Sequence, residues 1–101
     1  MKYDVVINKL DLEKFCVRHY IKKLSLFGSI LRDDFNEKSD VDVLVEFENG
    51  HVPGFFKLTE MEDELSGILG GRKTDIRTSE DLSRYFRKEV LESALVQYDA
   101  G

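Results

Sequence analysis

Residues 26–29, LFGS, and residues 40–47, DVDVLVEF, are the stretches that decide the fold. Apolar side chains alternate along the second stretch, which predicts a β-strand over residues 41–47. Successive side chains on a strand point to opposite faces, so we expect Asp40 and Asp42 on one face and the valines with Phe47 on the other. This strand therefore presents two carboxylates on one side and an apolar row on the other.

A turn at Gly28 and Ser29 precedes these carboxylates by ten residues. Glycine lets the backbone approach a ligand closely, and a serine at the start of a short helix offers a hydroxyl and an N–H to phosphate. Two adjacent carboxylates repel each other unless a cation lies between them. The pattern favours chemistry on a nucleoside triphosphate over the alternative that Asp40 and Asp42 form only a solvated strand edge.

The whole chain, residues 1–101, predicts one α+β domain in which a single sheet packs against helices. Helical apolar spacing covers residues 12–23, with Asp11 as the N-cap, and residues 55–69 and 84–98. Short strands are expected at residues 24–27 and 73–78, and a polar loop at residues 33–39. The order of the strands in the sheet does not follow from periodicity.

Asp75 supplies a third carboxylate, in the short strand that contains Thr74 and Ile76. Thr74 and Ile76 share one face, so Asp75 takes the other, and it joins Asp40 and Asp42 if the two strands are neighbours. Three carboxylates beside a phosphate-binding turn predict Mg²⁺, with two ions stabilising the attacking and leaving oxygens of an in-line displacement. Asp75 is also a candidate acceptor of the proton of the attacking hydroxyl.

Gly28-Ser29, Arg32, Asp40-Val41-Asp42 and Asp75 together resemble the motif of minimal nucleotidyltransferases in the DNA polymerase β superfamily. This resemblance implies a small mixed sheet flanked by helices. It implies metal on Asp40, Asp42 and Asp75, and nucleotide binding by Gly28, Ser29 and Arg32. One departure is Arg77, which follows Asp75 on the same face of a strand that is less apolar than usual for the family.

Stand-alone domains of this length resemble antitoxins of toxin–antitoxin operons. For them the resemblance implies transfer of AMP from ATP to a hydroxyl, on a tyrosine, of a partner toxin that is a helical ribonuclease of the HEPN group. A binding antitoxin that only occludes its toxin is the second hypothesis. Transfer to a small hydroxylated molecule such as an aminoglycoside is the third, and it needs an acceptor-binding surface supplied by oligomerisation.

Composition narrows the partners further. The net charge is −5, from 20 acidic and 15 basic residues, which argues against a nucleic-acid partner. The lone Cys16 excludes an internal disulfide. We expect it on the apolar face of the first helix, in the core of the protein. No apolar run suits a membrane span and no signal peptide is apparent, so we expect a cytoplasmic protein. Self-association into a homo-oligomer is compatible with the sequence.

Overall fold

The computed structural model describes residues 7–32, 36 and 38–101. Within them a four-stranded sheet has the order β3-β2-β1-β4. Its elements, in chain order, are α1 (Lys9–Arg18), β1 (Ile21–Phe27), η1 (Gly28–Leu31), β2 (Val41–Phe47), α2 (Phe55–Ile68), β3 (Thr74–Arg77), η2 (Ser79–Asp81), α3 (Arg87–Ser93) and β4 (Leu95–Asp99), where η denotes a 3₁₀ turn. β2 pairs in parallel with β3, and the other pairs are antiparallel, so the expected α+β fold with a mixed sheet is confirmed.

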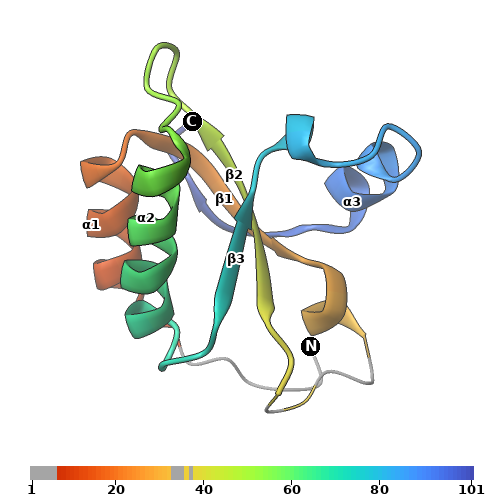
Figure 1. Ribbon diagram of the computed structural model, residues 1–101, viewed down its shortest axis with the longest axis horizontal. Helices are drawn as coiled ribbons and strands as arrows, with labels where there is room; N and C mark the ends of the chain where they lie inside the picture. The colour runs from red at the N-terminus through yellow and green to blue at the C-terminus, as the bar shows by residue number, and fades with distance from the viewer. Residues whose placement is uncertain (1–6, 33–35, 37) are drawn as a thin grey trace.

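Two helices cover one face of this sheet. In Figure 1, α1 and α2 lie side by side along it, while α3 lies on the opposite side. The register puts Leu26 beside Val43, and both side chains are buried under the two helices together with Phe15 and Leu65. The alternation expected for β2 is therefore confirmed, since its valines form part of the core.

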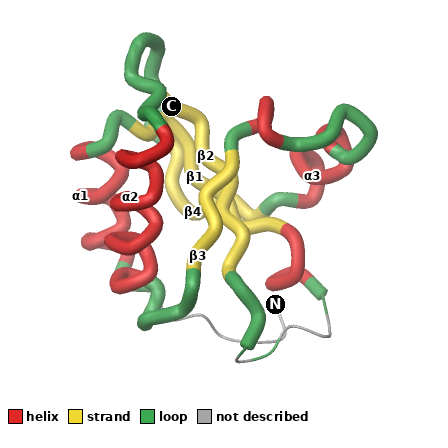
Figure 2. Tube along the Cα trace, viewed as in Figure 1, coloured by secondary structure: helices red, strands yellow, loops and turns green. Residues whose placement is uncertain are grey.

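The second face of the sheet carries polar residues of the same strands together with Leu44, which is also buried. Along β2, Asp42, Leu44 and Glu46 alternate with the buried valines. Along β3, Asp75 and Arg77 alternate with the buried Thr74 and Ile76. At one end of this face the C-terminal segment packs over Leu44, where Leu91, Ala94 and Val96 line a small hollow. Figure 2 shows α3 and the loop before it standing beside this end of the strands.

The first helix begins and ends earlier than its spacing predicted. α1 begins after Asn8, whose side chain accepts the Asp11 N–H at 3.1 Å, so Asn8 rather than Asp11 is the N-cap. It ends at Arg18, because Tyr20 adopts a left-handed backbone with φ of 57°. β1 then starts at Ile21, three residues before the predicted strand, and pairs with β2 from Asp42 to Phe47.

The helix expected over residues 84–98 is wrong at both ends. α3 covers only Arg87–Ser93, and the residues after it form β4 against the free edge of β1. The Ser93 hydroxyl donates to the Glu89 carbonyl in the last helical turn, a bond that competes with regular helix geometry. The backbone groups on the outer edge of β1 need partners, and Val96 and Tyr98 suit a strand as well as a helix.

The remaining predicted helix and strand agree closely with the structure. α2 and β3 match their predicted ranges within one or two residues. Phe55 and Phe56, at the start of α2, are both exposed and contact each other edge to face. Part of the predicted loop at residues 33–39 lies outside the described residues. The helices of the described chain are each too short or too polar to cross a bilayer.

Cys16 provides a test of the core. Its side chain is buried between α1 and the sheet, and burial raises the pKa of its thiol to about 12. Thiolate is the reactive form, so at about pH 8 we expect the native protein to react with a thiol reagent at least about 1,000-fold more slowly than the unfolded chain. A spectrophotometric thiol assay with and without denaturant measures this ratio.

A matched control places the thiol on the exposed side of the same helix. Val17 is 63% exposed, so Val17→Cys in a Cys16→Ala background should react in the native state at nearly the unfolded rate. Native Cys16 reacting within tenfold of that control would contradict the buried position.

Candidate active site

The strand register brings Asp42 and Asp75 together. Asp42 is the parallel partner of Asp75 on β3 and the antiparallel partner of Phe27 on β1. Neighbouring strands lie about 4.8 Å apart, so the two carboxylates project side by side from the sheet face opposite the buried Val43 and Ile76. The expectation that the third strand neighbours the second is therefore confirmed, and Asp40 lies immediately before β2.

Gly28 and Ser29 lie directly against Asp42. Gly28 has φ of 73°, and a Cβ built on it would stand 2.4 Å from Asp42 Oδ2, so this position requires glycine on both counts. The Ser29 N–H donates to Asp42 Oδ2 at 3.4 Å, and the Ser29 hydroxyl donates to the Asp40 carbonyl at 3.2 Å. The turn is thus attached to the beginning of β2 by side chain and backbone.

The helix expected after this turn is a single 3₁₀ turn, η1. Ile30 is fully buried in the core and holds the turn against the sheet. The Arg32 N–H donates to the Ser29 carbonyl at 2.9 Å, and Arg32 itself is exposed. Its positive charge acts to lower the pKa of Asp42, as the smallest of the influences on that carboxyl.

The surroundings of Asp42 disfavour its charged form. Burial is the main cause and raises the pKa of the Asp42 carboxyl above its ordinary value, and the charges of Asp75 and Asp40 raise it further. The Ser29 hydrogen bond acts in the opposite direction. A half-buried carboxylate beside two others is unfavourable by itself, and a bound cation would reverse this balance.

The position of Asp75 on β3 is fixed by its own contact with Arg77 and by a contact of the neighbouring Ile76 with α2. Its Oδ2 accepts the Nε–H of Arg77 at 3.1 Å and lies 3.1 Å from Arg77 Nη2. On the outer edge of the strand, the Ile76 N–H donates to Glu62 Oε2 of α2 at 2.7 Å. Although Glu62 belongs to an acidic stretch of α2, its side chain is half-buried and bonded to the edge of β3. Glu62 lies four residues after Leu58 and three before Leu65, so helical spacing places it at the border of the buried face. This spacing is the sequence signal that indicates its partial burial.

The carboxylates of Asp42 and Asp75 lie on the same face of the sheet without forming a ready coordination shell. Among the described residues, no three Asp, Glu, His or Cys side chains are arranged to hold one ion. The reason lies in their present partners, since Asp42 is turned to Ser29 and Asp75 to Arg77. The donor set nevertheless consists of hard carboxylate oxygens, the type that Mg²⁺ prefers.

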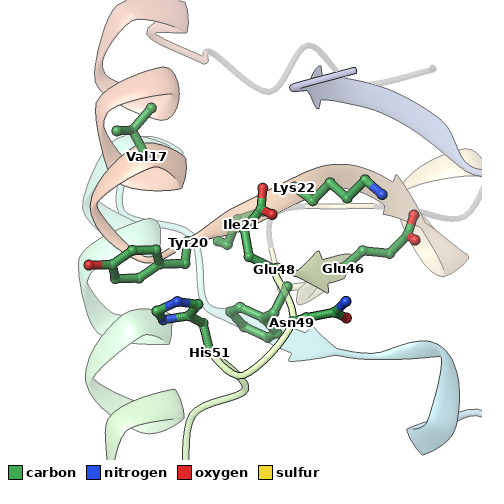
Figure 3. Close-up of a pocket in the computed structure, with 9 residues that line it drawn as sticks. Val17, Tyr20, Ile21, Lys22, Glu46, Glu48, Asn49 and His51 are labelled. Carbon is green, nitrogen blue, oxygen red and sulfur yellow. The ribbon is translucent and has the colours of Figure 1, made fainter.

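A separate hollow lies at the opposite end of β2. It has a volume of about 730 Å³ and is lined by residues that include Tyr20, Lys22, Glu48 and His51. In Figure 3 the Tyr20 and His51 rings lie against each other, and their centroids are 3.8 Å apart. Phe47 also lines it, whereas Asp42 and Gly28 do not, so this hollow is distinct from the carboxylate site.

Gly28 offers a direct test of the contact between turn and strand. We expect Gly28→Ala to lower the free energy of unfolding by about 2–3 kcal/mol, since it adds left-handed strain and displaces the Asp42 carboxyl. Gly50→Ala is the matched control, because Gly50 has φ of 80° and open space around it. It should lose only about 1 kcal/mol. Urea unfolding followed by circular dichroism measures both values, and equal losses would contradict the close approach to Asp42.

Comparison with known proteins agrees with this geometry. The family model of the nucleotidyltransferase domain matches residues 11–96. "Protein adenylyltransferase MntA" of Thermococcus cleftensis is 36% identical over 74 residues, which are 73% of this chain and 72% of that protein.

Solved structures agree as well. "Structure of putative minimal nucleotidyltransferase" superposes with a TM-score of 0.68 at 32% identity, covering 86% of each chain. "Crystal structure of the toxin-antitoxin with AMP-PNP" superposes with a TM-score of 0.70 at 17% identity, covering 92% of this chain and 74% of that one, and shows the fold. The motif, the fold and these matches lead to one conclusion: the chain belongs to the nucleotidyltransferase domain family and is a nucleotidyltransferase of the minimal type.

Proposed function

We propose that this nucleotidyltransferase is Mg²⁺-dependent and transfers AMP from ATP to a hydroxyl of a partner toxin, so that it acts as an antitoxin. The toxin would be a HEPN-type ribonuclease and the acceptor hydroxyl would belong to a tyrosine. One observation carries the catalytic part: the parallel register that sets Asp42 beside Asp75, with Gly28 in contact with Asp42. The similar protein of Thermococcus cleftensis is named as a protein adenylyltransferase, which supports a protein acceptor.

The donor set fits magnesium. Asp40, Asp42 and Asp75 would hold it, and the mutual repulsion that raises the pKa of Asp42 is the kind that a divalent cation removes. When bound, Mg²⁺ would neutralise phosphate oxygens and stabilise the negative charge of the transition state. We propose two ions, as the three-carboxylate pattern indicates.

The chain's own residues would bind and orient the nucleotide. Gly28 has no side chain at the point of closest approach to Asp42, which leaves its backbone accessible to a phosphate. Ser29 and Arg32 flank the same turn, and they would contact the phosphates with a hydroxyl and a guanidinium. These contacts would set the α-phosphorus opposite the incoming hydroxyl.

The reaction is an in-line displacement. The acceptor hydroxyl oxygen forms a bond to the α-phosphorus, and the bond from that phosphorus to the bridging oxygen of the β-phosphate breaks. Pyrophosphate leaves with the bonding electron pair, and the hydroxyl proton passes to the Asp75 carboxylate. Asp75 is 37% exposed at its side chain, so an acceptor at the surface of a second protein can reach it.

Neutralisation by binding alone is the second candidate, and exposed aromatic side chains favour it. Phe55 and Phe56 are 77% and 84% exposed, and Tyr85 and Phe86 are 78% and 61% exposed. Large exposed apolar side chains are typical of protein contact surfaces. Such surfaces serve a catalytic antitoxin as well, so the two candidates differ in whether the carboxylates are needed.

The decisive experiment is intact-mass spectrometry of the neighbouring-gene protein after incubation with this domain, ATP and Mg²⁺. We expect a mass gain of one or more AMP units, and Asp40→Asn/Asp42→Asn should slow it at least about 100-fold, because two of the proposed metal ligands are lost. Glu13→Gln/Asp63→Asn removes two exposed carboxylates from α1 and α2 and should leave the rate unchanged.

The same samples separate the two candidates. A stable complex with no mass gain, and full inhibition of the partner by Asp40→Asn/Asp42→Asn, would establish neutralisation by binding and overturn the catalytic proposal. A mass gain that both double variants retain would place the catalytic residues elsewhere in the chain.

A further inference from the structure

Arg77 brings a fixed positive charge to the carboxylate site. It lies two residues after Asp75 on β3, so both side chains are on the face that carries Asp42. Its Nε and Nη2 atoms are each 3.1 Å from Asp75 Oδ2. Two donors of one guanidinium therefore converge on a single carboxylate oxygen.

Asp75 and Asp42 therefore have partners of different charge. Asp42 receives a weak hydrogen bond from the Ser29 N–H at 3.4 Å, whereas Asp75 receives a full positive charge at 3.1 Å. An arginine is always protonated, and its planar group holds a carboxylate more rigidly than a lysine does. In the structure Arg77 thus occupies one side of the oxygen donor set that would otherwise be available to a metal ion.

The pair is also accessible to exchange. The Asp75 and Arg77 side chains are 37% and 49% exposed, and exposed ion pairs contribute little to stability. A divalent cation can therefore displace the guanidinium without unfolding the strand, and β3 keeps its attachment to α2 through Glu62.

We propose that Arg77 is the internal counter-ion of Asp75 and lowers the affinity of the site for free divalent cations, which must displace its guanidinium to reach that carboxylate. Arg77 is a positioning residue here, because it acts through Asp75. The inference rests on the proposed function, in which Asp40, Asp42 and Asp75 hold the metal. It makes the site less prone to fill with metal alone.

Binding of Mn²⁺ alone, measured by isothermal titration calorimetry without nucleotide, tests the inference. We expect Arg77→Gln to bind Mn²⁺ about fivefold more tightly than the unchanged protein, and Arg77→Lys to lie between them. Arg84→Gln is the matched control, since it removes the same charge from an exposed arginine whose contact is with Tyr85. It should change the dissociation constant by less than about twofold. An Arg77→Gln value equal to that of Arg84→Gln, or weaker than the unchanged protein, would overturn the proposal.

A double-variant cycle tests whether the effect passes through Asp75. In an Asp75→Asn background we expect Arg77→Gln to change Mn²⁺ affinity by less than about twofold, because the guanidinium no longer has a charged partner. A fivefold effect that persists in this background would show a general field effect and would overturn the assignment. Thermal unfolding of each variant confirms that the fold is retained.

The experiment also distinguishes this inference from the proposed function. Loss of Mn²⁺ binding in Asp40→Asn/Asp42→Asn, with no effect of Arg77→Gln, would overturn the role of Arg77 and leave the metal site in place. Absence of Mn²⁺ binding both to the unchanged protein and to Arg77→Gln would overturn both.

Discussion

The parallel pairing of β2 with β3 is the constraint on which the site depends. The Val41 N–H donates to the Lys73 carbonyl at 2.8 Å, which aligns Val41 with Thr74. The next pair in the register is Asp42 with Asp75. A slip of one residue would bury Asp75 and expose Ile76, so burial of the apolar residues on the helix face enforces the neighbouring carboxylates on the other. The hydrophobic core thereby sets the geometry of the polar site on the other face.

Glycine is what allows the turn and the strand to meet. Gly28 combines a left-handed backbone with a position where a side chain would overlap Asp42, and Ile30 secures the same turn in the core. The result is a half-buried carboxylate whose charge is disfavoured by burial and by its two acidic neighbours. A half-buried carboxylate beside two like charges is typical of functional sites, where a ligand supplies the compensating positive charge.

Secondary structure was predictable where one period dominated. The alternation in residues 41–47 and the helical spacing in residues 55–69 correspond to β2 and α2, because the valines of β2 and the apolar residues of α2 are buried on one face of each element. The C-terminal segment was mispredicted, since Val96 and Tyr98 fit both periods and their partner is the edge of β1, far away in the chain. The start of β1 was missed for the same reason, as the length of β2 decides where β1 begins.

The sequence by itself determined the chemistry available to this protein. It specifies a Gly-Ser turn, three aspartates in or directly before two short apolar stretches, and an arginine two residues after the last aspartate. Tertiary structure decided which groups meet: Asp42 with Asp75 and Gly28, Asp75 with Arg77, and Glu62 with the edge of β3. The longest of these contacts joins Asp42 and Asp75, which are 33 positions apart. Local spacing carries no information on strand order, because pairing is selected by burial and backbone hydrogen bonding over the whole sheet.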